Sequence, residues 1–409
     1  MRIIILLFIL SNSIFGQIIQ KPVGCFAGTN GTNPLVLAHN DVRGVLLIEK
    51  WSEIEKIQGE YDFTSLNSKI EAVKSAGLKY SLAIAGGAFG SPSWLIDSLN
   101  VTYQDFDYQG KSWRLPLWWD PTCDQKLTSL INELGVEYGS DSELSHIYVT
   151  QMTVNGIEGH LNGVDIPTLK NNGFSNQIWI NAAKKTVLDF MNAFPDKPIV
   201  FEIHEIDRNI TIPVSIITDL TNDPNLCSRF GLGMWWISGK TTYQSDLIDF
   251  ISEYEGDKYA QIIGRSDQIE RFEDDDHSNV FAQAKSLGIR YIEPWPYEFQ
   301  HNTYDNLMAD FNEWADNNFQ SSDTCLVTSS VNEISDKNEV LNVHPNPAKD
   351  YIQLQIDKPL QLSIINITGA KVKDYSIVAD GKLNVANLNK GIYFVVDEQG
   401  NNIARFVKE

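Results

Sequence analysis

Two apolar runs with a helix-like segment between them decide the fold: Gly44-Val-Leu-Leu-Ile-Glu49, then Leu66–Ala76, then Lys79-Tyr-Ser-Leu-Ala-Ile-Ala85. Both runs have the length of buried strands, and the segment between them has apolar residues at helical spacing and a glycine, Gly77, just after its end. A strand, a helix and a second strand in this order are typical of a parallel βαβ unit. The stretch therefore predicts an α/β fold built on a parallel sheet.

The same alternation continues as far as Phe319 and predicts a (β/α)8 TIM barrel, because eight such units fit in about 270 residues. A doubly wound sheet is the alternative, but no glycine-rich phosphate loop follows the first strand. Further strands are predicted at His146–Met152, Pro198–His204, Phe230–Ile237, Tyr259–Gly264 and Ile289–Trp295, with a short one inside Val101–Trp119. Helices are predicted near Gln125–Tyr138, Asn176–Ala193, Val214–Leu220, Gln244–Glu253 and Asn279–Leu287.

The composition excludes several classes of protein. The chain has 409 residues, of which 43% are hydrophobic and 21% charged, as in a folded globular protein. Its net charge of −21 argues against a nucleic-acid binder, because neutralising phosphates needs a surplus of Lys and Arg. No zinc spacing or phosphate loop is present, and the acidic run Glu273-Asp-Asp-Asp-His277 is interpreted as a solvated loop rather than a calcium site. We therefore expect neither a metal nor a cofactor.

The first 16 residues have the layout of a signal peptide. Arg2 precedes the apolar run Ile3–Leu10, and the segment Ser11-Asn-Ser-Ile-Phe-Gly16 ends in a small residue before Gln17. A membrane anchor is the alternative, but about 20 apolar residues are needed to span a bilayer and this run is far shorter. No later segment is long enough either, so we expect an exported protein without a membrane span.

Four cysteines remain for the mature chain: Cys25, Cys123, Cys227 and Cys325. In an oxidising compartment they can form two disulfides in three connectivities. The first and last strands of a closed barrel are neighbours, so we predict a Cys25–Cys325 pair, with buried free thiols as the alternative.

The chain changes character after Phe319. Residues 320–339 are polar and lack periodicity, as in a linker. Short alternating runs follow, such as Tyr351–Ile356, Leu360–Ile365 and Ile392–Val396, and turn residues separate them. This pattern predicts a small all-β sandwich over residues 340–409.

Four motifs in this last region occur in a familiar order: Asn342-Val-His-Pro-Asn-Pro-Ala-Lys-Asp350, Asn366-Ile-Thr-Gly-Ala-Lys-Val372, Leu388-Asn-Lys-Gly-Ile-Tyr-Phe394 and Arg405-Phe-Val-Lys-Glu409. Together they resemble the C-terminal sorting domain of the type IX (Por) secretion system of Bacteroidetes. The resemblance implies export through the periplasm to the outer cell surface or the medium, with the type IX machinery as a partner. A carbohydrate-binding β-module is the alternative.

Polar residues gather after the predicted strands, where TIM barrels carry their working groups. Residues 51–63 include Trp51, Ser52, Glu55, Gly59, Tyr61, Asp62 and Phe63, and residues 86–95 include Pro92, Trp94 and Leu95. These positions resemble the clan-A glycoside hydrolases, particularly the β-galactosidase-like branch, although Lys56 stands where that branch usually has proline. The resemblance implies a hydrolase of glycosidic bonds.

Glycoside hydrolysis needs one carboxylic acid for the leaving oxygen and a second carboxylate as nucleophile or base. The resemblance places the acid/base after the fourth strand, where Asn155-Gly-Ile-Glu158 makes Glu158 the candidate. The family nucleophile at the end of the seventh strand has no match, because Tyr259–Ser266 contains no carboxylate. Asp267 or Glu270 could serve if the register differs.

Strand alternation suggests where the second carboxylate lies. It places Tyr291, Glu293 and Trp295 on one face, and it directs Glu202 and His204 into the barrel mouth. Glu293 is our first choice and Glu202 our second. An ion pair of either residue with Arg265 is the structural alternative, because a buried carboxylate needs a partner or a ligand.

Ten tryptophans are many for this length, and several lie near predicted strand ends, where aromatic faces can stack on sugar rings. The predicted substrate-binding residues are Trp51, Trp119, Asn155, His160, His204, Trp235, Arg265 and Trp295. The sequence thus predicts a secreted glycoside hydrolase acting on an extracellular oligo- or polysaccharide. The alternative is a barrel that binds glycans at the cell surface without cleaving them.

Overall fold

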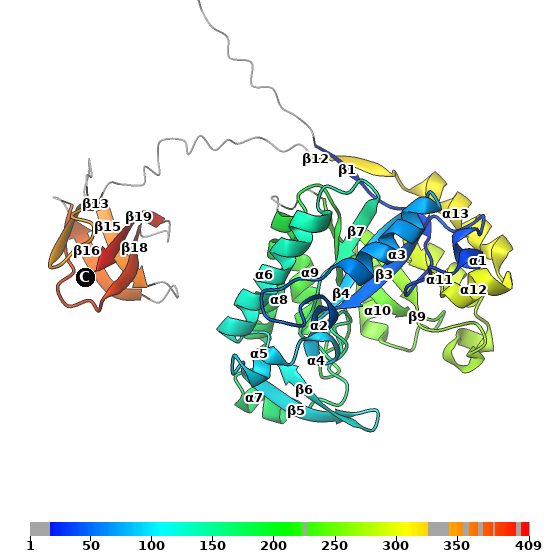
Figure 1. Ribbon diagram of the computed structural model, residues 1–409, viewed down its shortest axis with the longest axis horizontal. Helices are drawn as coiled ribbons and strands as arrows, with labels where there is room; N and C mark the ends of the chain where they lie inside the picture. The colour runs from blue at the N-terminus through cyan, green and yellow to red at the C-terminus, as the bar shows by residue number, and fades with distance from the viewer. Residues whose placement is uncertain are drawn as a thin grey trace, which may run out of the picture. The chain divides into compact units, whose positions relative to one another are not determined.

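The computed structural model describes residues 17–223, 226, 228–325, 343–354, 360–366, 371–378, 381–397 and 402–408. These residues fall into two compact units, one within Gly16–Leu326 and the other within Val327–Glu409 (Figure 1). The predicted signal peptide and the predicted linker beyond Cys325 lie outside the described residues. In the described part of the chain, no helix is both long and apolar enough to cross a membrane.

The first unit is a barrel of eight parallel strands. Each strand pairs in parallel with its neighbours, and a parallel bridge between Ala27 and Val45 joins the two ends of the sheet. The TIM barrel predicted from the sequence is thereby confirmed. In sheet order the strands are β2 (Gly24–Cys25), β11 (Tyr291–Glu293), β10 (Asp257–Ile262), β9 (Phe230–Ile237), β8 (Ile199–Glu202), β7 (Leu144–Tyr148), β4 (Lys79–Ala85) and β3 (Gly44–Lys50).

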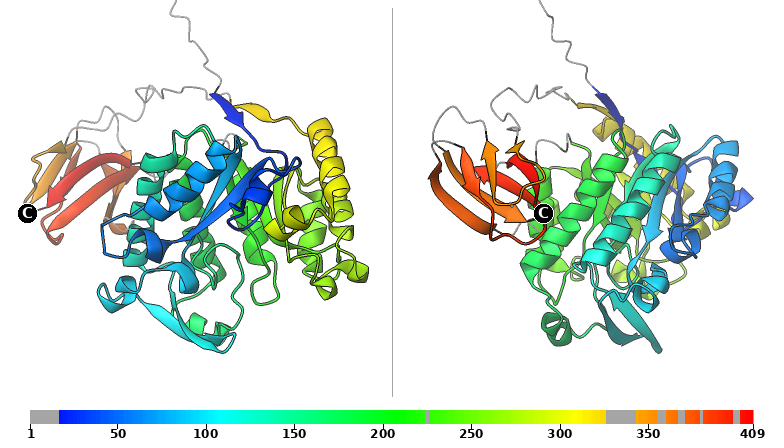
Figure 2. Two further views of the ribbon diagram at one scale, coloured as in Figure 1. Left: turned by 45° about the vertical axis from the view of Figure 1, so that its right-hand side comes forward. Right: turned by 60° about the vertical axis from the view of Figure 1, so that its left-hand side comes forward.

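Helices surround this sheet (Figure 2). Six of the longer ones lie close to their predicted positions: α3 (Thr64–Ser75), α6 (Pro121–Tyr138), α8 (Asn176–Ala193), α9 (Thr211–Thr221), α10 (Ser245–Glu253) and α11 (Asn279–Ser286). A further long helix, α13 (Asp305–Asn318), has no counterpart among the predicted helices. Helix α6 begins where it does because the Asp120 carboxylate accepts the N–H groups of Thr122 and Cys123, and Pro121 fits the first turn. Short helices occupy the loops: α1 (Pro34–Leu37), α2 (Trp51–Ile54), α4 (Gly87–Gly90), α5 (Trp94–Asp97), α7 (Ile166–Asn171) and α12 (Pro296–His301), with 3-10 turns η2 (Ile269–Arg271) and η3 (Glu273–Asp275).

The strand predicted inside Val101–Trp119 is wrong as a barrel strand. This segment forms an antiparallel hairpin of β5 (Tyr103–Tyr108) and β6 (Lys111–Pro116), while β4 pairs directly with β7. Residues of β5 alternate between exposed and buried, whereas a strand inside a barrel is covered on both faces. The eighth barrel strand is instead the two-residue β2, which is too short to give a sequence signal.

The predicted Cys25–Cys325 disulfide is also wrong. Cys25 lies in β2 as a buried free thiol, and its S–H donates to the carbonyl of Met308 at 3.7 Å. The strand that carries Cys325, β12 (Ser322–Cys325), pairs instead with β1 (Gln17–Gln20), so that Cys325 lies opposite Gln17. Burial raises the pKa of the Cys25 thiol and keeps it unreactive. The pairing of β12 with β1 also places residues 322–325 with the barrel rather than with the linker.

The second unit contains two antiparallel sheets. One has strands β13 (Val343–His344), β14 (Tyr351–Leu354) and β17 (Lys382–Asn384), and the other has β15 (Leu360–Asn366), β16 (Lys371–Val378), β18 (Gly391–Asp397) and β19 (Asn402–Lys408). Ile352 and Leu383 of the first sheet share a buried core with Val395 and Phe406 of the second. The predicted β-sandwich is therefore confirmed.

Candidate active site

The loop after β7 carries Glu158 and holds it through Asn155. The Oδ1 atom of Asn155 accepts the backbone N–H groups of Ile157 (3.1 Å) and Glu158 (2.9 Å), and its Nδ2 donates to Oε2 of Glu158. Gly156 has a φ of +87° and lies so close to Gly86 that a Cβ would come within 2.3 Å of its backbone. A glycine is therefore required for this turn. The two predicted residues are in contact although two others separate them in the chain.

Glu158 is a carboxylic acid close to its titration point at neutral pH. Its side chain remains 23% exposed, and its Oε1 lies 3.9 Å from Nε2 of His204. Burial raises the pKa of Glu158 to about 7, and the negative charge of Glu202 adds to this, while His204 and the Asn155 amide act in the opposite direction. A group with this pKa can both give and accept a proton near pH 7, as a general acid/base must.

Glu202, the second choice for the other carboxylate, lies beside Glu158 but is fully enclosed. Its Oε1 accepts the N–H of Trp235 (3.0 Å) and its Oε2 accepts the N–H of Gly159 (2.7 Å). The Nδ1 atom of His204 is 3.0 Å from Oε1. Both oxygens are thus occupied by donors, and the side chain has no open face toward a substrate.

Two histidines border this carboxylate pair, and their protonation differs. Burial lowers the pKa of His204, but the charges of Glu202 and Glu158 outweigh burial, and the net shift is upward. The ring of His160 lies 5.5 Å from that of His204, and burial lowers the pKa of His160 to about 3. His204 therefore favours the cation, and His160 is neutral at physiological pH.

Ligand atoms of Glu158, Glu202 and His204 lie within 4.8 Å of one another, so we tested this group as a metal site. Glu202 already accepts two backbone N–H groups, and His204 uses Nδ1 for its contact with Glu202. Only Glu158 and Nε2 of His204 remain for a metal, fewer than the three protein ligands of a catalytic zinc site. The group fits a hydrogen-bonded network better than a metal centre.

Glu293, the first choice for the second carboxylate, lies at the end of β11 and is fully buried. Its Oε1 accepts the hydroxyl groups of Tyr291 (2.6 Å) and Tyr148 (3.1 Å), and its Oε2 accepts Nε2 of Gln261 (2.8 Å). Burial raises the pKa of Glu293 to about 7, and these hydrogen bonds counteract only part of the rise. Gln261 of β10, from the strand without a carboxylate, thus serves to hold Glu293.

Arg265 does not pair with either buried carboxylate, so the alternative of an ion pair with Glu202 or Glu293 is wrong. Its guanidinium forms two hydrogen bonds to Asp267, at 2.9 and 2.8 Å, and lies over the ring of Tyr297. Arg265 and Asp267 are only two residues apart in an exposed loop, so the short-range pair forms in preference to one that would bury the arginine. Glu293 is satisfied by neutral side-chain donors instead, and Glu202 by two backbone N–H groups and His204.

The predicted tryptophans take different positions. Trp51 is fully buried and donates its indole N–H to Glu55 at 2.7 Å, so it packs the loop after β3 and cannot stack on a sugar. Trp235 is 7% exposed and meets the ring of Tyr148 edge-on inside the barrel. Trp119 and Trp295 are half-buried and donate to the carbonyls of Asn172 and Ile262 respectively, which leaves part of each ring exposed.

A continuous set of aromatic side chains, which includes the predicted His160 and His204, lies next to Glu158. We call this set the aromatic arc. The centroids of successive rings are 4.1 to 6.3 Å apart, and two histidines lie in the middle of the series. In order, its members are Trp113, Phe89, Tyr108, His160, His204, Trp236 and Tyr243. Recognition of the Gln109-Gly110 turn, where both residues have positive φ, would have predicted the hairpin that supplies Tyr108 and Trp113.

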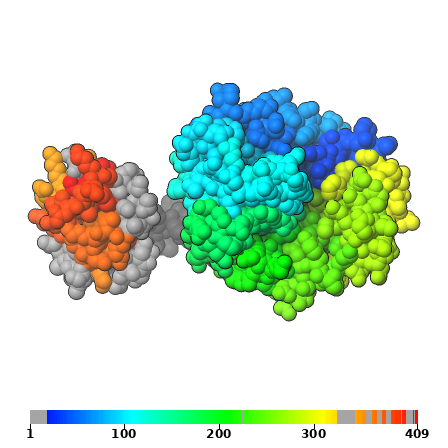
Figure 3. All heavy atoms as spheres, turned by 90° about the horizontal axis from the view of Figure 1, so that it is seen from below, coloured from blue at the N-terminus to red at the C-terminus, as the bar shows by residue number. Residues whose placement is uncertain are grey.

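The hairpin reaches the site by packing on the loop after β7 (Figure 3, cyan beside green). Gln104 of β5 donates to the carbonyl of Asp165 at 3.0 Å. Gly163 approaches Tyr108 so closely that a Cβ would lie 3.2 Å from its side chain. The same loop therefore carries Glu158 and supports the hairpin.

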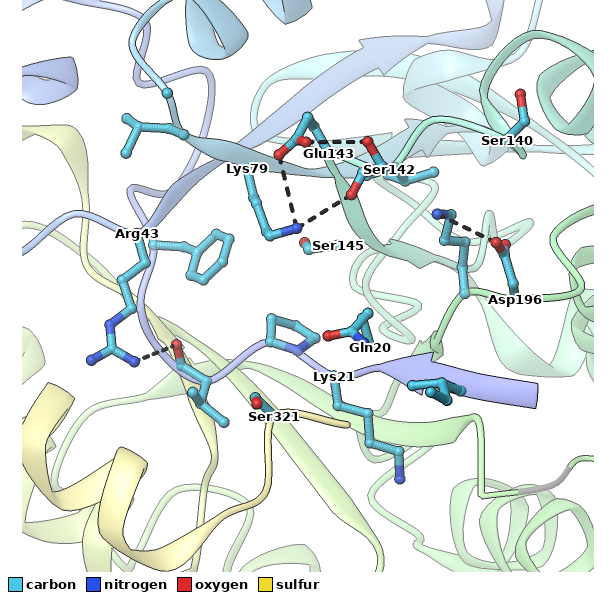
Figure 4. A pocket seen from close by; sticks show the side chains of 18 residues that line it. Gln20, Lys21, Arg43, Lys79, Ser140, Ser142, Glu143, Ser145, Asp196 and Ser321 are labelled. Atoms are coloured by element: carbon cyan, nitrogen blue, oxygen red, sulfur yellow. Dashed lines mark hydrogen bonds and ion pairs between the residues drawn. The ribbon is translucent and has the colours of Figure 1, made fainter. Parts of the chain in front are cut away.

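A cavity of about 610 Å³ lies at the opposite end of the barrel (Figure 4). Its lining comes from the beginnings of the strands and includes Phe26, Arg43, Lys79, Glu143 and Ser145. Lys79 and Glu143, both on one side of this lining, form an ion pair at 3.8 Å. This end of a TIM barrel usually contributes stability rather than chemistry, so we place the candidate site at Glu158 and not in this cavity.

Comparison with known proteins identifies the C-terminal unit. Residues 342–409 match the family described as "Secretion system C-terminal sorting domain". This unit is a sorting domain. It directs the protein through type IX secretion to the cell surface or the extracellular space. No curated protein sequence matches the chain.

Solved structures similar to this chain include glycoside hydrolases. The catalytic domain of β-amylase from Paenibacillus polymyxa has 10% identity and a TM-score of 0.51, over 72% of this chain and 99% of that chain. β-Galactosidase from Rahnella sp. R3 (10% identity, TM-score 0.45, 73% and 58% of the two chains) and xylanase 10B from Thermotoga petrophila RKU-1 (11%, 0.43, 67% and 82%) are more distant in fold. At such identities the likeness concerns the fold alone, and the barrel has the fold of the family that it resembles in sequence.

Proposed function

We propose that the barrel is a secreted glycoside hydrolase that cleaves an extracellular oligo- or polysaccharide, with Glu158 as its acid/base. The observation that carries this proposal is the state of Glu158. Its carboxyl group is partly exposed at the carboxyl end of β7, is held by Asn155, and has a pKa of about 7. Such a group is suited to protonating the oxygen of a leaving sugar at neutral pH.

In the proposed reaction, protonated Glu158 gives its proton to the glycosidic oxygen as the bond from that oxygen to the anomeric carbon breaks. Positive charge develops on the anomeric carbon and the ring oxygen in the transition state. A second carboxylate then either attacks this carbon or removes a proton from the attacking water. Glu158, left as a carboxylate, is ready to accept a proton in a two-step reaction.

Glu293 is better suited than Glu202 to be the second carboxylate. Its three donors are the side chains of Tyr291, Tyr148 and Gln261, and side chains can rotate when a ligand enters. Glu202 is held by two backbone N–H groups, and these cannot leave without moving β9 and the loop after β7. We therefore retain Glu293 in this role.

The aromatic arc supports a sugar as the substrate. Tyr243 is 42% exposed, and Tyr108 and Trp113 are half-buried, so each keeps an accessible part. Aromatic rings that are partly open beside a carboxyl group offer apolar faces to the C–H groups of a sugar ring. Tyrosine hydroxyl groups can also bind sugar hydroxyl groups.

A second candidate function is glycan binding without cleavage. The observation in its favour is that Glu202 and Glu293 are almost completely enclosed, at 1% and 0% exposure. A barrel in which Glu158 alone faces the substrate would bind through the aromatic arc but lack the second carboxylate that hydrolysis needs.

One measurement separates the two functions. We expect the full-length secreted protein to release reducing ends from at least one member of a panel of soluble and insoluble polysaccharides. Binding to each member is measured in parallel by affinity electrophoresis or pull-down. Binding without release of reducing ends would establish the second function, and the absence of both would reject a carbohydrate substrate.

The sorting domain leads to a prediction on export. Deleting residues 340–409 is expected to leave a folded barrel that accumulates in the periplasm, because the two units have separate buried cores. Fractionation followed by thermal melting of the retained protein measures both outcomes. An insoluble barrel after this deletion would contradict the independence of the units, and normal export would contradict the role of the sorting domain.

A further inference from the structure

Glu202 and His204 form a pair beside Glu158, and His204 lies next to one oxygen of its carboxyl group. Asn155 donates to Oε2 of Glu158, and its own Oδ1 is held by two backbone N–H groups, so the amide cannot turn over. The other oxygen, Oε1, faces Nε2 of His204 at 3.9 Å. Oε2 is thus the acceptor of the Asn155 amide, and Oε1 is the oxygen on the side of His204.

Glu202 in turn fixes the state of His204. Both oxygens of Glu202 accept backbone N–H groups, so Glu202 offers acceptor oxygens to its neighbours. Nδ1 of His204, 3.0 Å away, must then carry the proton of that contact. The arrangement leaves Nε2 directed at Glu158 and stabilises a positive charge on the ring.

We propose that Glu202 and His204 act as a positioning dyad that determines the protonation of Glu158, rather than as a catalytic carboxylate and a sugar ligand. The inference rests on the proposed function of Glu158 as acid/base. When Glu158 passes its proton to the leaving oxygen and becomes a carboxylate, the imidazolium of His204 stabilises the new negative charge. No proton leaves His204 in this step, and Glu158 regains its proton from water in the following one.

Few charged or titratable groups surround His204, so few other charges compete with its effect on the pKa of Glu158. From its own segment, Glu202 and Glu205 face it, and Glu158 and the neutral His160 face it from the loop after β7. From β9 and the segment after it come only the rings of Trp236 and Tyr243. Among the described groups that shift the pKa of Glu158, His204 is the one cation.

The first test is the pH profile of kcat/KM. A general acid works in its protonated form, so activity falls as the pH rises through the pKa of Glu158. His204→Gln removes the cation that stabilises the carboxylate, and we expect this basic limb to move upward by about one pH unit. His160→Gln is the matched control: it removes a neutral histidine 5.5 Å away, so kcat/KM can fall but the limb stays in place.

The second test needs no activity. In the full-length protein, we expect the imidazole of His204 to titrate by NMR above the ordinary histidine pKa, and to titrate lower in Glu202→Gln and in Glu158→Gln. Glu202 is buried, so Glu202→Gln can fail to fold. Glu158 is partly exposed, so we expect Glu158→Gln to fold and to provide the same measurement. If His204 titrates above the ordinary histidine pKa but the wild type hydrolyses no substrate, the dyad stands and the proposed function is rejected. If the wild type is active and the basic limb of its pH profile stays in place in His204→Gln, the dyad alone is rejected.

Discussion

Glu158→Gln is expected to lower the hydrolysis of glycosides with poor leaving groups by about 10²–10⁴-fold, the usual contribution of general acid–base catalysis. Glutamine has almost the size of glutamate and can still contact Asn155, but it cannot give a proton. Binding of the intact glycan is expected to persist, because the amide can hydrogen-bond to it. The variant should be no less stable than the wild type near neutral pH, because the raised pKa of Glu158 shows that folding favours its uncharged form.

The matched control for this variant is Glu49→Gln. Glu49 also lies near the carboxyl end of a barrel strand, but its carboxylate pairs with Lys69 of α3 at 3.0 Å and lies away from Glu158. We expect it to keep wild-type turnover, with at most a small loss of stability from a partly exposed ion pair. Initial rates on a substrate that the wild type cleaves measure both variants. Equal turnover in Glu158→Gln and the wild type would exclude Glu158 as the proton donor.

The parts of the fold that were predictable depend on local patterns. The strands β3 and β4 with α3 between them follow from apolar runs and helical spacing, since residues such as Leu66, Ile70 and Val73 form one buried face of that helix. Glu158 is a candidate because the resemblance places an acid/base after the fourth strand. The inward positions of Glu293 and Glu202 were predictable because side chains alternate along a strand, and both are buried.

The parts that failed depend on distant contacts. Trp51 stands in a motif typical of substrate binding, but the neighbouring Glu55 and the ring of Trp94 enclose it, which no local pattern reveals. The hairpin of β5 and β6 alternates like a strand and was assigned to the barrel. The two-residue β2 is a strand only because β11 lies beside it, with Ile292 opposite Cys25. A contact of this kind leaves no signal in the sequence around Cys25.

Glu293 combines complete burial with three neutral donors, and this has a consequence for stability. Its pKa is raised from the ordinary 4.5 to about 7 in the folded protein, so folding favours the protonated acid. The stabilisation is complete below pH 4.5, where the unfolded chain is also protonated, and it is lost as the pH rises toward 7. A difference of two to three pKa units corresponds to about 3 kcal/mol in the free energy of unfolding.

Glu293→Gln is therefore expected to gain stability relative to the wild type by about 3 kcal/mol between pH 5 and pH 8, because glutamine does not ionise. Denaturant unfolding at a series of pH values measures this difference. Glu293→Leu is the matched comparison. Its stability should depend on pH as that of Glu293→Gln does, but it should be lower than that of Glu293→Gln at every pH, because Tyr291, Tyr148 and Gln261 lose their acceptor. A pH-independent difference between Glu293→Gln and the wild type would contradict the raised pKa. Because these measurements report the folding of Glu293→Gln, its turnover can be interpreted separately. Loss of hydrolysis in a stably folded variant assigns Glu293 as the second carboxylate. Full hydrolysis shows instead that Glu293 is a buried acid enclosed by Tyr148 and Tyr291.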